Sequence, residues 1–276
     1  MTTDETDEQP PLEVAVLPTM DCLPVYYADR MGLFDSLGVA VHLQHFTSQM
    51  DIDTALTRGH AQLGHTSLAR LEVMERKDGD TLMVVAQTGE RLYLITARTK
   101  RIRSLRQLKG DMVAVERFSD ADYWSDRITE QAGLELQDIY RPQFNDLQLR
   151  TRMLNDQLID AAFLPEPYAT QARMAAGRQV FQTPDTVESF DCFASSLNAS
   201  KAETLFVKAY ARAVRELNRE PNADTLRLIL QETYALPDEI IDTLKLPRLK
   251  PLAPPSDSLR RRAAQWVEKR MSIYND

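Results

Sequence analysis

The sequence has few of the features that identify catalytic, metal-binding or membrane proteins by pattern alone. Its 276 residues include only two cysteines and four histidines, and none of these has the spacing of a metal site. GxSxG, HExxH, CxxC, Walker and dinucleotide-binding motifs are missing. No apolar run reaches the roughly 18 residues that span a bilayer. We therefore expect no metal site, no cofactor and no membrane-spanning segment.

Positive charge is also scarce. The chain has 33 Lys and Arg against 41 Asp and Glu, and its net charge is −8. Proteins that bind nucleic acids carry basic faces, so this balance argues against a nucleic-acid partner. The hydrophobic share of 43% is enough for a sizeable core, and the length suits two α/β lobes better than one.

The first eleven residues, MTTDETDEQPP, lack the basic start and apolar core of a signal peptide. They are polar, acidic and end in proline, so we interpret residues 1–11 as a flexible leader. Two locations stay open. The protein is either cytoplasmic, or periplasmic or lipid-anchored outside the inner membrane with its signal segment missing from this chain. Cys22 and Cys192 do not discriminate between them, and whether the two pair stays open.

Short apolar strands alternate with helices through the first two thirds of the chain. Strands are expected at residues 12–17, 39–46, 61–64, 81–87, 92–97, 112–115, 139–144, 159–164 and 179–182. From residue 201 the pattern is helical, at residues 201–218, 223–234, 237–244 and 257–271. This alternation predicts an α/β protein with mostly parallel sheets flanked by helices, followed by a helical C-terminal tail.

One strand-to-helix corner is rich in aromatic and acidic side chains. The strand at residues 112–115 is followed by FSDADYW, which opens a helix with Ser119 and Asp122 spaced as an N-cap and its reciprocal carboxylate. In open α/β sheets, ligands collect where a strand's carboxyl end feeds a helix N-terminus. The corner is therefore a candidate ligand wall. The alternative is an ordinary capping box followed by a helix whose aromatic residues face the core.

The order of several motifs resembles a known family. The chain contains ADRMGLF, GVAV, AQLGHTS, SLRQLKGDMVAV and IDAAFLPEPYA in that order. This order is similar to that of bacterial substrate-binding proteins of ABC importers, which have the type 2 periplasmic-binding fold, in the branch that handles sulfonates, nitrate and thiamine precursors. The resemblance implies two lobes that clamp a small ligand without chemistry, with a permease and an ATPase as partners. The sequence does not determine the oligomeric state, and we take a monomer as the default.

The resemblance also implies where the lobes divide. We place the two crossings between lobes near residues 88–91 and 186–191. Lobe 1 is then discontinuous, comprising residues 12–89 and 187–276, and lobe 2 comprises residues 90–186.

Carried over by position, the resemblance places the ligand-binding residues at strand ends and crossings. The first-lobe wall would be Thr19, Asp21, Tyr26, Ser48, His65, Thr66 and Ser67, with Thr88 at the first crossing. The second-lobe wall would be Phe118, Ser119, Asp120, Tyr123, Trp124 and Glu166, with Asp191 at the return crossing. Structural alternatives exist. Three of the serines occupy helix N-cap positions, and Glu166 also suits the positive start of a helix.

The acidic character of this set bears on the ligand. Five carboxylates would crowd the cleft, namely Asp21, Asp120, Asp122, Glu166 and Asp191, with Arg117 and His65 as the nearby positive charge. Carboxylates interleaved with aromatic rings suit a flat nitrogen-bearing ring or a cation, such as a pyrimidine-like thiamine precursor. Helix N-termini favour anions, so a sulfonate or nitrate ligand stays a second alternative.

Some proteins with the same fold are enzymes. The fungal-type pyrimidine synthases of thiamine biosynthesis need a cysteine-rich iron-binding cluster and a lysine for pyridoxal phosphate, and the chain has no CCCFC-like run. A menaquinone-pathway enzyme resembling chorismate dehydratase suits a cytoplasmic chain but needs basic or amide donors for its substrate's carboxylates. We predict a protein that is not an enzyme. A sensor that passes hinge closure to a partner protein cannot be separated from an importer component by sequence.

Overall fold

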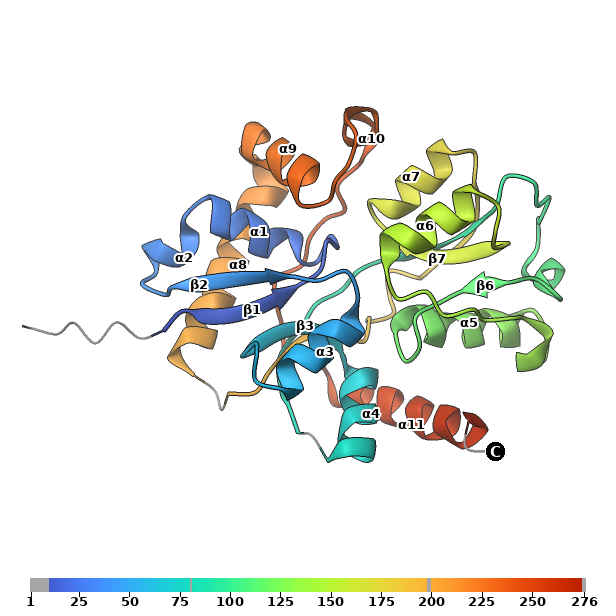
Figure 1. Ribbon diagram of the computed structural model, residues 1–276, viewed down its shortest axis with the longest axis horizontal. Coiled ribbons are helices and arrows are strands. Elements are labelled where there is room, and N and C mark those ends of the chain that lie inside the picture. Colours follow the sequence, from blue (N-terminus) through green and yellow to red (C-terminus); the bar gives the residue numbers. More distant parts are fainter. Residues whose placement is uncertain (1–9, 80, 198–199, 275–276) are drawn as a thin grey trace, which may run out of the picture.

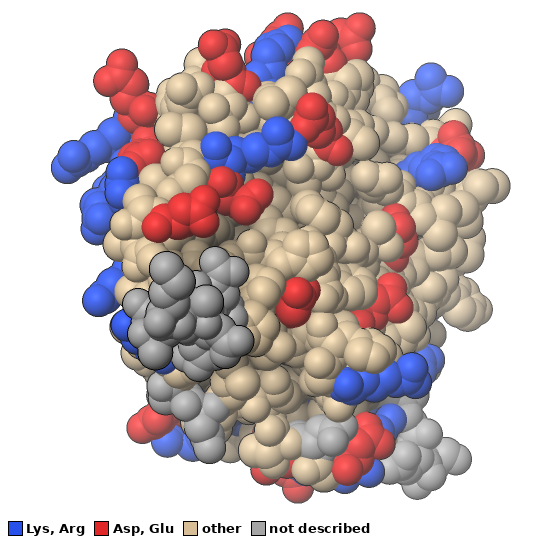
Figure 2. Space-filling model, turned by 60° about the vertical axis from the view of Figure 1, so that its left-hand side comes forward, with Lys and Arg blue, Asp and Glu red and all other residues tan. Residues whose placement is uncertain are grey.

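A computed structural model describes residues 10–79, 81–197 and 200–274. Two β-sheets lie side by side, and each is covered by helices (Figure 1). None of the described helices is long and apolar enough to cross a membrane. Acidic and basic side chains are interspersed on the face drawn in Figure 2.

The first sheet has five strands in the order β2-β1-β3-β9-β4. They are β1 (Leu12–Val16), β2 (Val41–His45), β3 (Leu63–Ser67), β4 (Met83–Gln87) and β9 (Asp191–Ser195). β1 pairs in parallel with β2 and β3, whereas β9 runs antiparallel to β3 and β4. The sheet is mixed rather than mostly parallel because β9 enters it from the second sheet, at the end where β4 leaves.

The second sheet has four strands in the order β6-β7-β5-β8. They are β5 (Leu92–Thr96), β6 (Val113–Ala114), β7 (Ala161–Pro165) and β8 (Arg178–Gln182). β6 and β7 are parallel, and β5 is antiparallel to β7 and β8. The strand expected at residues 139–144 forms only isolated bridges at Tyr140 and Gln143. Pro142 stands between these bridges and has no N–H to continue the ladder.

Helices cover both sheets. Those around the first sheet are α1 (Leu23–Arg30), α2 (Leu33–Ser36), α3 (Gln49–Thr57), α4 (Leu68–Asp78), α8 (Lys201–Arg219), α9 (Ala223–Glu232) and α10 (Asp238–Thr243). Those around the second sheet are the 3-10 helices η1 (Leu105–Leu108) and η2 (Leu136–Asp138) with α5 (Asp120–Gln131), α6 (Leu147–Asn155) and α7 (Tyr168–Met174). α8 packs against α1 and α2, and buries Phe206, Ala209 and Tyr210 in the core.

The predicted helical tail ends in α11 (Asp257–Tyr274), which packs along α4 (Figure 1). The same helix also reaches α5, because Trp266 Nε1 donates to Asp126 (2.9 Å) and Arg270 donates to Asp122 (2.9 Å). The tail therefore contacts helices of both sheets.

The chain passes between the sheets twice. Residues 88–91 connect β4 to β5, and residues 183–190 connect β8 to β9. These segments lie where the crossings were expected. The finer division into lobe 1 (12–89 and 187–276) and lobe 2 (90–186) stays a prediction.

Candidate ligand-binding site

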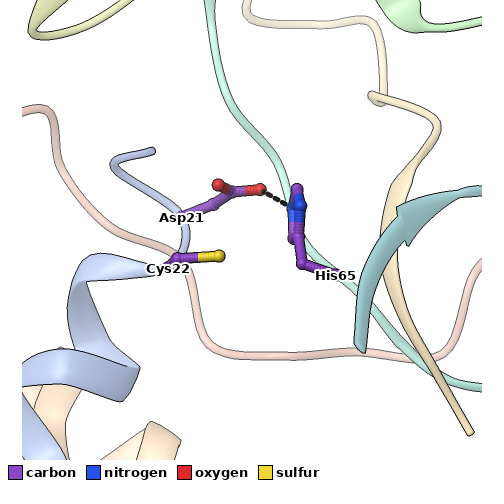
Figure 3. A group of neighbouring side chains, drawn as sticks. All are labelled: Asp21, Cys22 and His65. Atoms are coloured by element: carbon purple, nitrogen blue, oxygen red, sulfur yellow. Dashed lines mark hydrogen bonds and ion pairs between the residues drawn. The ribbon is translucent and has the colours of Figure 1, made fainter. Parts of the chain in front are cut away.

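A buried carboxylate and imidazole meet where β1 and β3 end (Figure 3). Asp21 follows β1, and His65 lies on the neighbouring strand β3. Asp21 Oδ2 accepts from His65 Nε2 (2.7 Å) and from the Thr88 hydroxyl (2.7 Å), and Oδ1 accepts from the Thr19 hydroxyl (2.6 Å). Four of the predicted residues therefore form a single hydrogen-bonded group, with Thr88 bringing in the first crossing.

Asp21 and His65 stabilise each other's charge. Burial acts to raise the pKa of Asp21, but the charge and hydrogen bond of His65 outweigh it and lower that pKa to about 2. Burial acts to lower the pKa of His65, but the charge of Asp21 raises it above its ordinary value. These shifts favour the charged form of each side chain, with His65 Nε2 and Asp21 Oδ2 at hydrogen-bond distance.

The loop that carries Asp21 is held by bonds from distant parts of the chain. The Tyr210 hydroxyl donates to the Asp21 carbonyl (2.7 Å), and the Tyr234 hydroxyl donates to the Thr19 carbonyl (2.6 Å). Met20 N donates to the carboxylate of Glu90 in the first crossing (2.8 Å). Such support fixes the position of the carboxylate before any ligand arrives.

Two carboxyl groups share one hydroxyl at the return crossing. The Ser189 hydroxyl lies within hydrogen-bond distance of Asp191 Oδ2 (2.8 Å) and of Asp120. It has one proton, so it cannot donate to both. Burial and then the charge of Asp191 raise the pKa of Asp120 to about 8, and burial also raises the pKa of Asp191. Asp120 therefore keeps a proton at neutral pH, which it can donate to Ser189.

Asp120 and Asp191 join elements of both sheets. Asp120 lies in the first turn of α5, capped by Ser119, and accepts from Phe190 N in the return crossing (3.0 Å). Asp191 begins β9 and accepts from the Gln49 amide at the start of α3 (3.2 Å). These bonds connect a helix of the second sheet, the crossing and a helix of the first sheet.

Ser67 and the α5 corner are in direct contact. Ser67 caps α4, and its hydroxyl also donates to the Phe118 carbonyl (3.3 Å). Arg70 of α4 donates to the Arg117 carbonyl (3.0 Å) and pairs with Asp53. Thr66 donates to the same Asp53 (2.6 Å).

The aromatic residues of the corner lie against the C-terminal helix. The Tyr123 ring centroid is 4.8 Å from that of Phe190 and 5.6 Å from that of Trp266. Phe118 meets Trp266 edge-on at 6.3 Å, whereas Trp124 packs 5.7 Å from Phe181 of the second sheet. These contacts are the core packing that we considered as the alternative to a ligand wall, and their part in ligand binding stays a prediction.

The three remaining predicted residues make contacts of their own. Ser48 caps α3 and donates to Asp51 (2.8 Å). Tyr26 is buried, and its ring stacks on His45 at 5.6 Å. Glu166 accepts from Thr170 N (3.0 Å) and pairs with Arg173.

Glu166 also lines a groove of about 230 Å³ that reaches Thr243 and Lys245 beside α10. Glu166 therefore lies where α7, which covers the second sheet, contacts α10, which covers the first sheet.

Sequence reasoning missed two acidic residues, Glu90 and Glu116. Burial, and then the charge of Asp21, raises the pKa of Glu90 well above its ordinary value. Burial raises the pKa of Glu116 to about 7. The sequence pattern could have indicated both residues. Glu116 directly follows the strand predicted at residues 112–115, and Glu90 lies within the predicted first crossing.

Three potential metal-ligand atoms also meet here, although their spacing in the sequence gives no sign of it. The donor atoms of Asp21, Cys22 and His65 lie within 4.8 Å of one another (Figure 3), and all three residue types bind zinc. Burial raises the pKa of the Cys22 thiol well above its ordinary value, so a metal would have to displace a proton as well as the Asp21–His65 bond. Cys22 and Cys192 are free, buried thiols, so they do not pair.

Comparison with known families identifies the chain. The family model described as "NMT1/THI5 like" matches residues 19–222, which contain every predicted site residue. The chain belongs to the NMT1/THI5-like family. A comparison with curated proteins gives no match.

Solved structures share the fold of this NMT1/THI5-like chain. The periplasmic aliphatic sulphonate binding protein SsuA from Escherichia coli is 18% identical, with a TM-score of 0.78, over 96% of this chain and 94% of that one. The periplasmic nitrate-binding protein NrtA from Synechocystis PCC 6803 is 15% identical, with a TM-score of 0.73, over 91% and 74%. A ligand-binding component of an ABC-type import system from Staphylococcus aureus, solved with zinc bound, is 14% identical, with a TM-score of 0.76, over 95% and 92%.

At these identities the similarity establishes the fold. The predicted two-lobed type 2 periplasmic-binding fold is confirmed, and with it the family resemblance. The three similar structures are transport binding proteins rather than enzymes.

Proposed function

We propose that this chain is the solute-binding component of an ABC importer, which holds a small ligand between its lobes and makes or breaks no covalent bond. The observation that carries the proposal is the convergence of residues from both sheets and both crossings on one buried polar region. Asp21 and His65 come from the first sheet, Thr88 and Ser189 from the crossings, and Asp120 from the second sheet's helix. The implied partners are a permease and an ATPase, and the implied location is outside the inner membrane, with the protein as a monomer.

Four of the buried polar atoms that have no hydrogen-bond partner within the described residues support the proposed ligand class. They are Tyr26 OH, Gln49 Oε1, His65 Nδ1 and Glu116 Oε1. A buried polar atom without a partner costs about 1–3 kcal/mol, so a bound ligand that supplies one is favoured. Gln49 and ionised Glu116 accept, whereas Nδ1 of a protonated His65 donates. A ligand that offers N–H groups beside one acceptor, as an aminopyrimidine does, matches this set.

Two nearby cations are already engaged, which disfavours a sulfonate or nitrate ligand. Arg70 is bonded to Asp53 and to the Arg117 carbonyl. Arg150 donates to the carbonyls of Phe144 and Phe163. An anion would therefore face the carboxylates of the site while these two guanidinium groups are used elsewhere. The same engagement disfavours a chorismate-type substrate with several carboxylates. We therefore favour an amine or heteroaromatic solute that resembles a thiamine precursor.

A second candidate is a transition-metal solute, favoured by the donor set of Asp21, Cys22 and His65. Zinc binding by this set would release the thiol proton, so its affinity would rise with pH. Titration of zinc into chelator-treated protein tests this candidate. Loss of binding in Cys22→Ser, with binding retained in Cys192→Ser, would support it.

A thermal-shift screen tests the main proposal against its alternatives. The compounds are aminopyrimidines, polyamines, nucleobases, taurine, nitrate, chorismate and zinc chloride. A ligand at 100 times its dissociation constant adds about 2.7 kcal/mol of stability, which is readily measured. We expect a shift with aminopyrimidines. A clear shift with taurine or chorismate, and none with any nitrogen-bearing ring or amine, would overturn the proposed ligand class.

A further inference from the structure

Glu116 is a buried acid whose surroundings leave one oxygen unused. Its side chain is 8% exposed, and Oε1 has no hydrogen-bond partner within the part of the chain that the structure describes. The residue follows β6 at the corner that leads into α5. A buried carboxylate in a native protein normally has its oxygens satisfied, so this acceptor needs an explanation.

The neighbouring Arg150 does not donate a hydrogen bond to this oxygen. Its Nη2 lies 3.8 Å from Glu116 Oε2, which is too far for a hydrogen bond. Its donors are instead used on two backbone carbonyls, with Nε and Nη2 on Phe144 O (2.9 and 2.6 Å) and Nη1 on Phe163 O (3.2 Å). Arg150 therefore holds the α6 start and β7 together, and offers Glu116 only its charge.

Glu116 faces the first sheet. The two residues after it accept bonds from α4, because Arg70 donates to the Arg117 carbonyl and Ser67 to the Phe118 carbonyl. The charged groups that act on Glu116 from the packed elements are Arg150 of α6, Arg70 of α4, Asp53 of α3 and Asp191 of β9. Glu116 in turn acts on His65 of β3. The unused oxygen therefore belongs to the boundary between the two sheets, where the proposed ligand would lie.

We propose that Glu116 is the second-lobe residue that determines specificity, accepting an N–H of the ligand at Oε1. This inference rests on the proposed function. It assigns opposite ends of the ligand to opposite lobes, with His65 donating from the first and Glu116 accepting from the second.

A ligand-binding Glu116 has two measurable effects. Only the ionised carboxylate accepts at both oxygens, and burial raises the pKa of Glu116 to about 7, so affinity for a neutral N–H donor should increase between pH 6 and 8. In addition, a residue that contacts the ligand loses affinity when its carboxylate becomes an amide, separately from any loss of stability caused by leaving the buried charge of Arg150 without its counter-ion.

The test compares Glu116→Gln with Asp111→Asn. Asp111 is a matched control because it is also buried in the second lobe and has a true ion-pair partner, Lys100 at 2.6 Å. Melting temperatures without ligand are measured at pH 5.5 and 8, and 4-aminopyrimidine is titrated calorimetrically at pH 6, 7 and 8. We expect Glu116→Gln to bind at least tenfold more weakly and to lose the pH dependence, at a temperature where the melting curves show both proteins folded. Asp111→Asn should bind like wild type, whatever its melting temperature.

The outcomes separate the two proposals. If the affinity of wild type for 4-aminopyrimidine does not change between pH 6 and 8, or if Asp111→Asn loses as much affinity as Glu116→Gln, the inference is wrong. If wild type binds 4-aminopyrimidine and Glu116→Gln binds it equally well, the inference fails and the proposed function stands. If wild type binds taurine and not 4-aminopyrimidine, both the ligand class and the assignment of Glu116 are overturned.

Discussion

His65 Nε2 and Asp21 Oδ2 lie 2.7 Å apart, and each of the two side chains is 2% exposed. A second histidine–carboxylate pair of the same length, His42 and Glu13, lies on β2 and β1 of the same sheet, but the His42 side chain is 64% exposed. The two pairs therefore differ mainly in burial. They offer a matched comparison of a site pair and a surface pair within one molecule.

Removing His65 should be far more costly than removing His42. His65→Leu leaves the charge of Asp21 buried without its cation, which typically costs about 3–5 kcal/mol of unfolding free energy. The exposed pair contributes little to stability, so His42→Leu should change the free energy of unfolding by less than about 0.5 kcal/mol. Urea unfolding at pH 6, below the raised pKa of His65, measures both effects. Equal effects of the two substitutions would show that the buried pair has no special role.

Stability should fall as the pH rises from 5 to 9. The folded pKa values of Glu116 and Asp120 are raised to about 7 and about 8, so their contributions are present in acid and are lost as the pH rises through those values. The raised pKa of His65 acts in the same direction. The lowered pKa of Asp21 affects stability only as the pH falls toward about 2. Melting curves should show this decline, and Asp120→Asn should flatten it. A wild-type melting temperature that rises toward pH 8 would contradict the assignment.

Trp266 should stabilise the contact between α11 and the α5 corner. Its ring meets Phe118, Tyr123 and Phe190, and its Nε1 donates to Asp126. Trp266→Ala should lower the free energy of unfolding by about 3–5 kcal/mol, as expected for truncation of a large buried aromatic residue. Ile273 on the same helix is 45% exposed, and Ile273→Ala is the control, with an expected change below about 0.5 kcal/mol. Similar costs for the two variants would mean that α11 is not anchored through Trp266.

Gly64 should be essential for the position of α3. A Cβ at this residue would lie 2.7 Å from Ile52 Cγ2 and 3.0 Å from Leu56 Cδ1, so Gly64→Ala must push α3 away from β3. Overpacking of this kind costs about 1–3 kcal/mol. Because α3 begins at Gln49, which donates to Asp191, ligand affinity should also decrease. Gly89→Ala is the control, since nothing lies within 4 Å of its Cβ position. Unchanged stability and affinity in Gly64→Ala would exclude this close packing.

Sequence reasoning predicted which loops hold the candidate site residues, but not which side chains contact each other there. The strand-end rule pointed to the corner that contains Asp120, and the family resemblance pointed to Asp21 and His65. Neither revealed that Asp120 and Asp191 share the Ser189 hydroxyl, or that Cys22 lies beside His65, because such meetings depend on side chains far apart in the sequence.

The aromatic residues illustrate a second limit. Helix α11, which packs against Tyr123, lies more than a hundred residues further along the chain, so the local pattern could not distinguish a ligand wall from a core. Asn145 and Asp146, just before α6, are both capping residue types, and only the geometry shows that Asp146 is the cap. The alternation of strands and helices predicted mostly parallel sheets and did not reveal that β9 runs antiparallel to both of its neighbours.

Calorimetric titration of 4-aminopyrimidine and of taurine into wild type, His65→Leu and His42→Leu tests the central claim most directly. We expect saturable binding of 4-aminopyrimidine to wild type and His42→Leu, loss of that binding in His65→Leu, and no binding of taurine. Saturable binding of taurine to wild type, with no heat from 4-aminopyrimidine, would contradict the proposed ligand class and the role of the buried pair.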